Sequence, residues 1–391
     1  MTGLDLLPSE EERLLADTAR DFFADRSPPG RVRTLRGDDT GFSWEIWREI
    51  AELGWAGLAL PEAHGGEGMG LIELCAVFEQ AGRALAPEPL HATLTAGLLL
   101  ARCGDELNQS AWLPQMAAGQ TVVALAHSER GARYDRTCVH TVAEPTSGGF
   151  RVHGSKVHVE GGAGAAAFIV TARTGGRPDD RSGLSAFVVP ADARGMEVIP
   201  QRRIDGRPAA LVSMKDVRVG KSALLGSVHK LADHLDQVLD LATIALAAEM
   251  LGGARAALDL TLEHLKTRVQ FGVVIGAFQA LQHRVARLFA ETELAASAVR
   301  AAAATADAVA RKGDEAEDDD RAAVARMASL AKAVTGRAFL HVADEGVQMH
   351  GGVGVTDEYD IGLYLKRARA ASATLGDEAW HTDRWATLSG Y

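Results

Sequence analysis

The spacing of hydrophobic residues changes twice along this chain, and that change constrains the fold more than any other feature. From residue 4 to 118, and again after Gly226, apolar residues recur at helical spacing. Between these regions lie short runs rich in β-branched and aromatic residues, separated by glycine-rich turn clusters. The sequence therefore predicts an α+β fold with three domains. These are an N-terminal all-helical domain (1–118), a middle antiparallel β-barrel or sandwich (119–225) and a C-terminal four-helix bundle (226–391).

Individual elements can be placed within this outline. The pattern predicts strands over 121–126, 139–143, 150–159, 168–173, 184–190, 196–200 and 211–219. It predicts roughly four long helices over 228–267, 279–312, 321–350 and 364–387. Alanine-rich stretches in these helices favour close helix packing, as in a bundle.

Composition and charge exclude several classes of function. The net charge of −11 argues against nucleic acid as a partner, because binding phosphates requires a basic surface. No run reaches the roughly 20 apolar residues of a membrane span, and Met1 to Glu12 lacks the apolar core of a signal peptide. Cys75, Cys103 and Cys138 lie far apart without metal-ligand spacing. We therefore expect a cytoplasmic protein with reduced thiols and no metal.

Two stretches indicate a site for a dinucleotide. Arg268-Val269-Gln270-Phe271-Gly272, followed by Ile275 and Gln279, reads as a helix end, a tight turn and a new helix start. A guanidinium, amides and backbone N–H groups gathered there could hold a diphosphate, although the same spacing also fits a plain helix–helix turn. The second stretch, Gln348 to Gly354, follows a helix and lacks the spacing of a Rossmann fingerprint. Its glycines would let a ligand approach the backbone closely.

Together these stretches resemble the signatures of the acyl-CoA dehydrogenase family, an RxxFG…FQ turn and a segment beginning QxxGGxG, and the resemblance covers the whole chain. It implies a homotetramer or a dimer of dimers in which one subunit binds the ADP part of its neighbour's FAD. It implies that the cofactor-binding residues are Arg268, Gln270, Phe271, Ile275 and Gln279, with Gln348, Gly351 and Gly352 beside them.

A third stretch resembles the family's flavin-binding loop but departs from it. Ser128 can replace the threonine whose hydroxyl bonds the flavin ring, whereas Arg130 and Tyr134 replace the loop's proline and serine. In the strand that follows, His158 stands for a tryptophan and Glu160 for a threonine. A carboxylate near the flavin would repel the anionic reduced ring.

The positions of the catalytic base depart further. By resemblance the base that removes the substrate's α-proton falls on Leu375 or, in a minority of members, on Ala242, with Thr243 at the position of an adjacent arginine that meets CoA. Leucine and alanine cannot accept a proton. The family's arginine–aspartate pair is also changed, to Lys366 and Arg367.

Displaced substitutes for the base are also available in the sequence. Asp377 and Glu378 follow Leu375, and Asp240 precedes Ala242. A shift of two residues along a helix turns a side chain by about 200°, so we expect these carboxylates to face elsewhere. Three histidines are further candidates, but a lone histidine is more often a hydrogen-bonded core or pocket residue. They are His127, His158 and His350.

The pattern of retained and lost residues favours one function and leaves others open. We expect a base-lacking subunit that completes the FAD site of a second acyl-CoA dehydrogenase-like chain, acting on a bulky acyl-CoA such as a steroid side chain. In this reading, an electron-transfer flavoprotein takes the electrons. The alternatives are a flavin oxidase or N-hydroxylase that uses oxygen, a non-catalytic scaffold, and a self-sufficient dehydrogenase with an unrecognised base.

Overall fold

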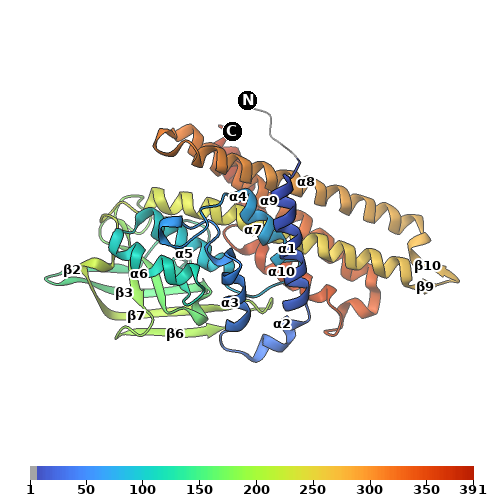
Figure 1. Ribbon diagram of the computed structural model, residues 1–391, viewed down its shortest axis with the longest axis horizontal. Coiled ribbons are helices and arrows are strands. Elements are labelled where there is room, and N and C mark those ends of the chain that lie inside the picture. Colours follow the sequence, from blue (N-terminus) through green and yellow to red (C-terminus); the bar gives the residue numbers. More distant parts are fainter. Residues whose placement is uncertain (1–6) are drawn as a thin grey trace. The chain divides into compact units, whose positions relative to one another are not determined.

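A computed structural model describes residues 7–391, which fall into two compact units (Figure 1). The helical unit comprises residues 7–34, 70–86 and 243–391. The sheet unit comprises residues 35–69 and 87–242. The N-terminal helices are thus shared between the units, because some pack on the C-terminal helices and others on the sheet.

The helical unit is built from long helices. It contains α1 (Glu10–Arg26), α2 (Arg31–Thr34), α4 (Leu71–Arg83), most of α7 (Ala232–Thr267), α8 (Gln279–Ala310), α9 (Asp318–His350), α10 (Ile361–Ala373) and α11 (Glu378–Leu388). Side chains start several of them. Ser9 caps α1 by accepting from the Glu12 N–H at 3.1 Å, and Glu317 and Asp320 form a reciprocal capping box at the start of α9.

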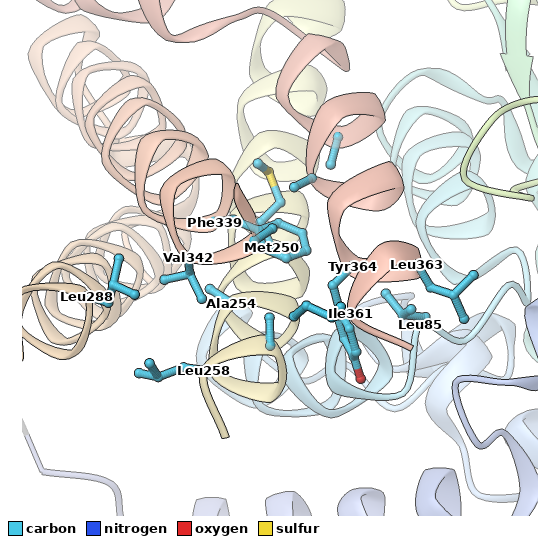
Figure 2. Close-up of a cluster of buried hydrophobic side chains, with 14 of the residues drawn as sticks. Leu85, Met250, Ala254, Leu258, Leu288, Phe339, Val342, Ile361, Leu363 and Tyr364 are labelled. Atoms are coloured by element: carbon cyan, nitrogen blue, oxygen red, sulfur yellow. The ribbon is translucent and has the colours of Figure 1, made fainter. Parts of the chain in front are cut away.

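The core of the helical unit lies where α7, α9 and α10 meet (Figure 2). Met250 and Phe339 are almost completely buried there. Gly253 permits this contact, because a Cβ at that position would lie 2.5 Å from the Phe339 ring. Burial of large apolar side chains of this kind stabilises a fold by roughly 1.5–3 kcal/mol for each residue.

The expected fourth helix of the bundle, 364–387, is wrong as a single element. α10 ends at Ala373 and α11 begins at Glu378. Between them Leu375 has φ +59° and Gly376 has φ +122°, which no α-helix accommodates. A Cβ at Gly376 would lie 2.5 Å from Trp380, so the bend requires glycine. The break falls at the position where the family resemblance places the catalytic base.

The sheet unit holds an eight-stranded sheet together with α3 (Trp44–Glu52), α5 (Leu90–Cys103) and α6 (Glu106–Ala117). The strands are β1 (Val123–Ala126), β2 (Val142–Thr146), β3 (Gly149–Glu160), β4 (Ala167–Arg173), β5 (Leu184–Pro190), β6 (Met196–Gln201), β7 (Ala209–Gly220) and β8 (Leu224–Leu225). Their order is β6-β7-β3-β2-β4-β5-β8, and β1 pairs with β4. Most neighbours are antiparallel, as expected, but β1 and β2 each pair with β4 in parallel.

One helix in the described part of the chain, α7, is long and apolar enough to cross a membrane by composition alone. However, 83% of its apolar window is buried inside the protein. Such burial is typical of the core helix of a bundle.

Candidate functional site

The first predicted nucleotide stretch forms an exposed turn between two long helices. α7 ends at Thr267, and β9 (Val269–Gln270) pairs with β10 (Val273–Val274) in a short hairpin before α8 begins (Figure 1). Phe271 and Gly272 both have positive φ, +54° and +81°, which closes the turn tightly. The Phe271 side chain is 91% exposed. Val269, Val273 and Phe278 are also exposed, so apolar side chains gather on this turn, as they do at contact surfaces.

The polar groups of this turn are available to a ligand. The exposed Arg268 side chain makes no ion pair with any residue from 7 to 391. Among the described residues, the Gln270 amide donates only to the neighbouring carbonyl of Val269, at 2.8 Å. Gln279 is exposed at the start of α8, whereas Ile275 packs against the helical core and anchors the turn.

The second stretch lies at the end of α9. Gly351, with φ +63°, terminates the helix, and Gln348 is exposed one turn earlier. A Cβ at Gly351 or Gly352 would meet nothing within 4 Å, so the backbone here is open. Gly354 differs, because a Cβ there would lie 2.6 Å from the Val347 carbonyl. The first two glycines thus leave room for a ligand, and the third is required by packing.

A stacked histidine pair brings the two stretches together. The rings of His264 and His350 lie 4.3 Å apart, and Tyr359 packs on His350 at 4.9 Å. His350 Nδ1 donates to the Gly346 carbonyl at 2.6 Å, and burial lowers the pKa of this ring. Burial, His350 and the nearby Arg268 together lower the pKa of His264. The guanidinium and the open glycines therefore lie at one end of the helical unit, and the residues present fit a diphosphate. His264 was not identified from the sequence.

The loop around Ser128 rests on a buried ion pair. Ser128 is exposed, and its carbonyl accepts from the Val157 N–H at 2.9 Å. Beneath it Lys156 Nζ donates to Glu129 at 2.7 Å, and both side chains are buried. Burial lowers the pKa of Lys156 to about 8, although Glu129 opposes this shift. His127 donates to or accepts from Thr171 at 3.1 Å within the same network. Polar contacts below the loop thus hold Ser128 in place.

The other two candidate histidines differ in exposure. His158 is exposed in β3 with φ +52°, and His350 is the buried ring described above. Neither ring forms an ion pair with a carboxylate among residues 7–391, unlike His91 and His341.

Both positions for the base lack a proton acceptor, and the neighbouring carboxylates are engaged. Leu375 packs against the helical core, and Ala242 is fully buried. Asp240 pairs with Arg136 at 2.9 Å. Glu378 pairs with Arg337 at 2.7 Å, and Asp377 caps α11 through the Trp380 N–H. The expected 200° rotation does not apply to Asp377 and Glu378, because the chain bends at Leu375 and the helix does not continue.

The two changed residues after the second stretch have partners of their own. Lys366 pairs with Asp357 at the surface, at 3.2 Å. Arg367 is buried and donates from Nε to Glu249 of α7 at 2.9 Å. Glu249 carried no signal in the sequence, because it lies in an apolar helix far from Arg367.

Glu160, the carboxylate at a threonine position of the family pattern, is paired. His91 Nδ1 lies 2.8 Å from Glu160 Oε2, and His91 Nε2 lies 2.9 Å from the Ala242 carbonyl oxygen. Two departures from the family pattern, Glu160 and Ala242, therefore meet at one histidine that sequence reasoning missed. No group of three or more potential metal ligands occurs in residues 7–391.

The fold and the two nucleotide stretches define an acyl-CoA dehydrogenase type of protein. Three family models match consecutive parts of the chain: Acyl-CoA dehydrogenase, N-terminal domain (residues 9–120), middle domain (124–217) and C-terminal domain (234–387). The chain belongs to the acyl-CoA dehydrogenase family, which confirms the resemblance and the α+β fold.

Known proteins resemble it over almost their whole length. Acyl-CoA dehydrogenase fadE12 of Mycobacterium bovis is 30% identical over 376 residues, covering 95% of this chain and 94% of that protein. A variant of the Tcur3481-Tcur3483 steroid ACAD is 33% identical, with a TM-score of 0.83, and the match covers 97% of this chain and 98% of that one. A chain in the structure of the ChsE4-ChsE5 complex from Mycobacterium tuberculosis is 25% identical, with a TM-score of 0.85. The match covers 99% of this chain and 99% of that one.

Proposed function

We propose that this chain is a flavoprotein subunit without a catalytic base, which acts with a second acyl-CoA dehydrogenase-like chain on an acyl-CoA. It lends its two nucleotide stretches to an FAD shared with that partner, and the partner supplies the base. FAD, when bound, supplies the hydride acceptor. Electrons then pass to an electron-transfer flavoprotein, and the complex works in the cytoplasm.

One observation carries the proposal. Leu375 and Ala242 offer no proton acceptor, while the nearest carboxylates pair with Arg136 and Arg337 or cap a helix. None of these carboxylates occupies either position at which the family resemblance places the base. At the same time Arg268 and the open backbone at Gly352 retain the means to bind a diphosphate. The positions of the catalytic base are thus replaced, whereas the residues proposed to bind the cofactor are present.

The division of tasks follows from what this chain's residues can do. Arg268 and Gln270 would donate to the diphosphate, and Gly351 and Gly352 would let it approach the backbone. The ring of Phe271 would cover the nucleotide from the turn. Ser128 would donate to the flavin ring from the sheet unit. None of these groups can remove a substrate proton.

Two related structures supply the expected partner and substrate class. One is the steroid ACAD named Tcur3481-Tcur3483, and the other is the ChsE4-ChsE5 complex. We infer a similar pairing here and a bulky, steroid-like acyl group as substrate.

Co-expression tests the proposal. This chain is produced alone and together with a second acyl-CoA dehydrogenase-like chain, encoded beside it, that carries glutamate at either base position. Bound flavin is measured from its absorbance, and dehydrogenation with an artificial electron acceptor. We expect stable co-purification and activity of the pair only. A Glu→Gln change at the partner's base should abolish that activity without loss of flavin.

The contrary result is equally defined. Stoichiometric FAD and a normal rate of acyl-CoA oxidation by the chain purified alone would overturn the proposal. Rapid reoxidation of the reduced flavin by air would point instead to an oxidase.

A further inference from the structure

His264 and Arg268 lie on one face of the chain at the end of α7. The Arg268 N–H donates to the His264 carbonyl at 2.9 Å, so the last helical turn continues through Arg268. Side chains four positions apart on a helix are neighbours. The His264 ring also stacks on His350 at 4.3 Å. The next two residues, Gly351 and Gly352, have an open backbone, since a Cβ on either would meet nothing within 4 Å. An imidazole is therefore adjacent to both parts of the proposed diphosphate site.

The two stacked rings differ in their ability to take up a proton. His350 is 5% exposed, its Nδ1 donates to the Gly346 carbonyl, and its Nε2 is buried without a hydrogen-bond partner among residues 7–391. A proton on that Nε2 would bury a charge with no acceptor beside it. His264 is only half-buried, and within the described part of the chain neither of its ring nitrogens is hydrogen-bonded. A proton added to the stack therefore goes to His264.

The charges around His264 determine how readily it is protonated. The titratable groups around it are its chain neighbours Glu263, Lys266 and Arg268, with His350 of α9 and Tyr359 after α9. Glu263 and Lys266 pair with each other at the surface, at 2.8 Å. Burial, followed by the charges of His350 and Arg268, lowers the pKa of His264. His264 forms no ion pair with any carboxylate from residue 7 to 391. An anion at Arg268 would supply negative charge and favour the protonated imidazole.

We propose that His264 is a second anion-binding residue beside Arg268, which takes up a proton from solvent when a diphosphate binds and so makes binding tighter as the pH falls. The ligand class is a nucleotide diphosphate, and the inference rests on the proposed function only for the identity of that nucleotide. The imidazolium adds a positive charge next to the guanidinium, and its N–H groups can donate to phosphate oxygens. Proton and diphosphate then strengthen each other's binding by the same factor.

ADP-ribose tests this linkage in the full chain, because its diphosphate carries no group that titrates near pH 6.5. In the chain labelled with ¹⁵N-histidine, we expect saturating ADP-ribose to move the titration midpoint of His264 upward by about one pH unit. The affinity for ADP-ribose should then be roughly fivefold tighter near pH 5.5 than near pH 7.5. His341, which pairs with Glu291 at 2.7 Å, is the internal control and should not move. An unmoved His264, or no binding of ADP-ribose, would overturn the proposal.

Two variants separate anion binding from a packing role. His264→Gln keeps a polar side chain that cannot take up a proton, so the pH dependence of ADP-ribose affinity should disappear while the affinity near pH 7.5 stays close to that of the unaltered chain. Arg268→Gln should raise the titration midpoint of His264 without any ligand, because a nearby positive charge is removed. The same pH dependence in His264→Gln as in the unaltered chain would place the proton elsewhere and overturn the proposal. These measurements need neither the partner chain nor dehydrogenation, so their failure is distinguishable from failure of the proposed function.

Discussion

Glu249 of α7 and Arg367 of α10 form an ion pair of 2.9 Å in which each side chain is only 4% exposed. In the sequence, Arg367 is a departure from the family's arginine–aspartate pair. In the folded chain it instead compensates a carboxylate that would otherwise be buried alone. The two residues are 118 positions apart and connect the middle of one helix to another across the helical core.

Removing one member of this pair should be costly. We expect Arg367→Met to lower the free energy of unfolding by about 3–5 kcal/mol, because Glu249 would stay buried without a countercharge. The double variant Glu249→Gln/Arg367→Met should recover most of that loss. Lys366→Met is the matched control, since its exposed partner Asp357 contributes less than about 1 kcal/mol. Denaturant unfolding measures the free energy of unfolding of all three variants. A double variant whose loss is the sum of the losses at each position would contradict coupling between Glu249 and Arg367.

Lys332 should make stability depend on pH. Its Nζ donates to the carbonyls of Ser372 and Gly376, at 3.2 and 2.8 Å, beside the bend at Leu375. Burial, and then the charge of Arg367, lower the pKa of Lys332 to about 7 from 10.5. Between these pH values the unfolded chain binds more protons than the folded one, so stability should rise with pH. Unfolding at pH 7 and pH 10 should show this rise in the unaltered chain and a smaller one in Lys332→Met. An equal rise in both would place the titrating group elsewhere.

Arg268→Ala should weaken the cofactor and leave the fold intact. A charge-assisted hydrogen bond contributes roughly 1.5–3 kcal/mol, so we expect FAD affinity to fall about tenfold to a hundredfold. The melting temperature of the apoprotein should not change, because the side chain has no ion-pair partner among residues 7–391. Arg321→Ala is the control, because Arg321 lies at the end of α9 that is far from Gln348 and the open glycines. Fluorescence titration of the complex with the partner chain measures FAD affinity, and unchanged binding would remove Arg268 from the site.

Two neighbouring glycines should respond in opposite ways. A Cβ at Gly352 meets nothing within 4 Å, so Gly352→Ala should leave apoprotein stability unchanged but weaken FAD binding by filling the ligand's space. Gly354→Ala should destabilise the fold by about 1–3 kcal/mol, because its methyl group would crowd the Val347 carbonyl. Thermal unfolding of the chain alone measures the effect on stability, and FAD titration of the complex with the partner chain measures the effect on binding. Normal FAD affinity in Gly352→Ala would show that no ligand approaches there.

Hydrophobic spacing determined the order of elements because helix and strand periodicity is a local property. The helices α7, α8 and α9 begin and end close to the predicted positions, and each predicted strand overlaps an observed one. The two stretches predicted to bind a nucleotide also depend on a few adjacent residues each, and their role stays a prediction. Likewise, the sequence alone showed that Leu375 and Ala242 cannot act as bases.

Only the tertiary structure decided which partners are contacted by the residues that depart from the family pattern. Helical periodicity runs through Leu375, so it does not indicate the break there, which depends on Gly376 beside Trp380 and on the N-cap Asp377. His91 meets Glu160 across 69 positions, and the Ala242 carbonyl across 151. Periodicity reports which face of an element is buried but not which distant side chain it meets. A buried charge or ring is therefore explained only when the folded chain brings its partner into contact.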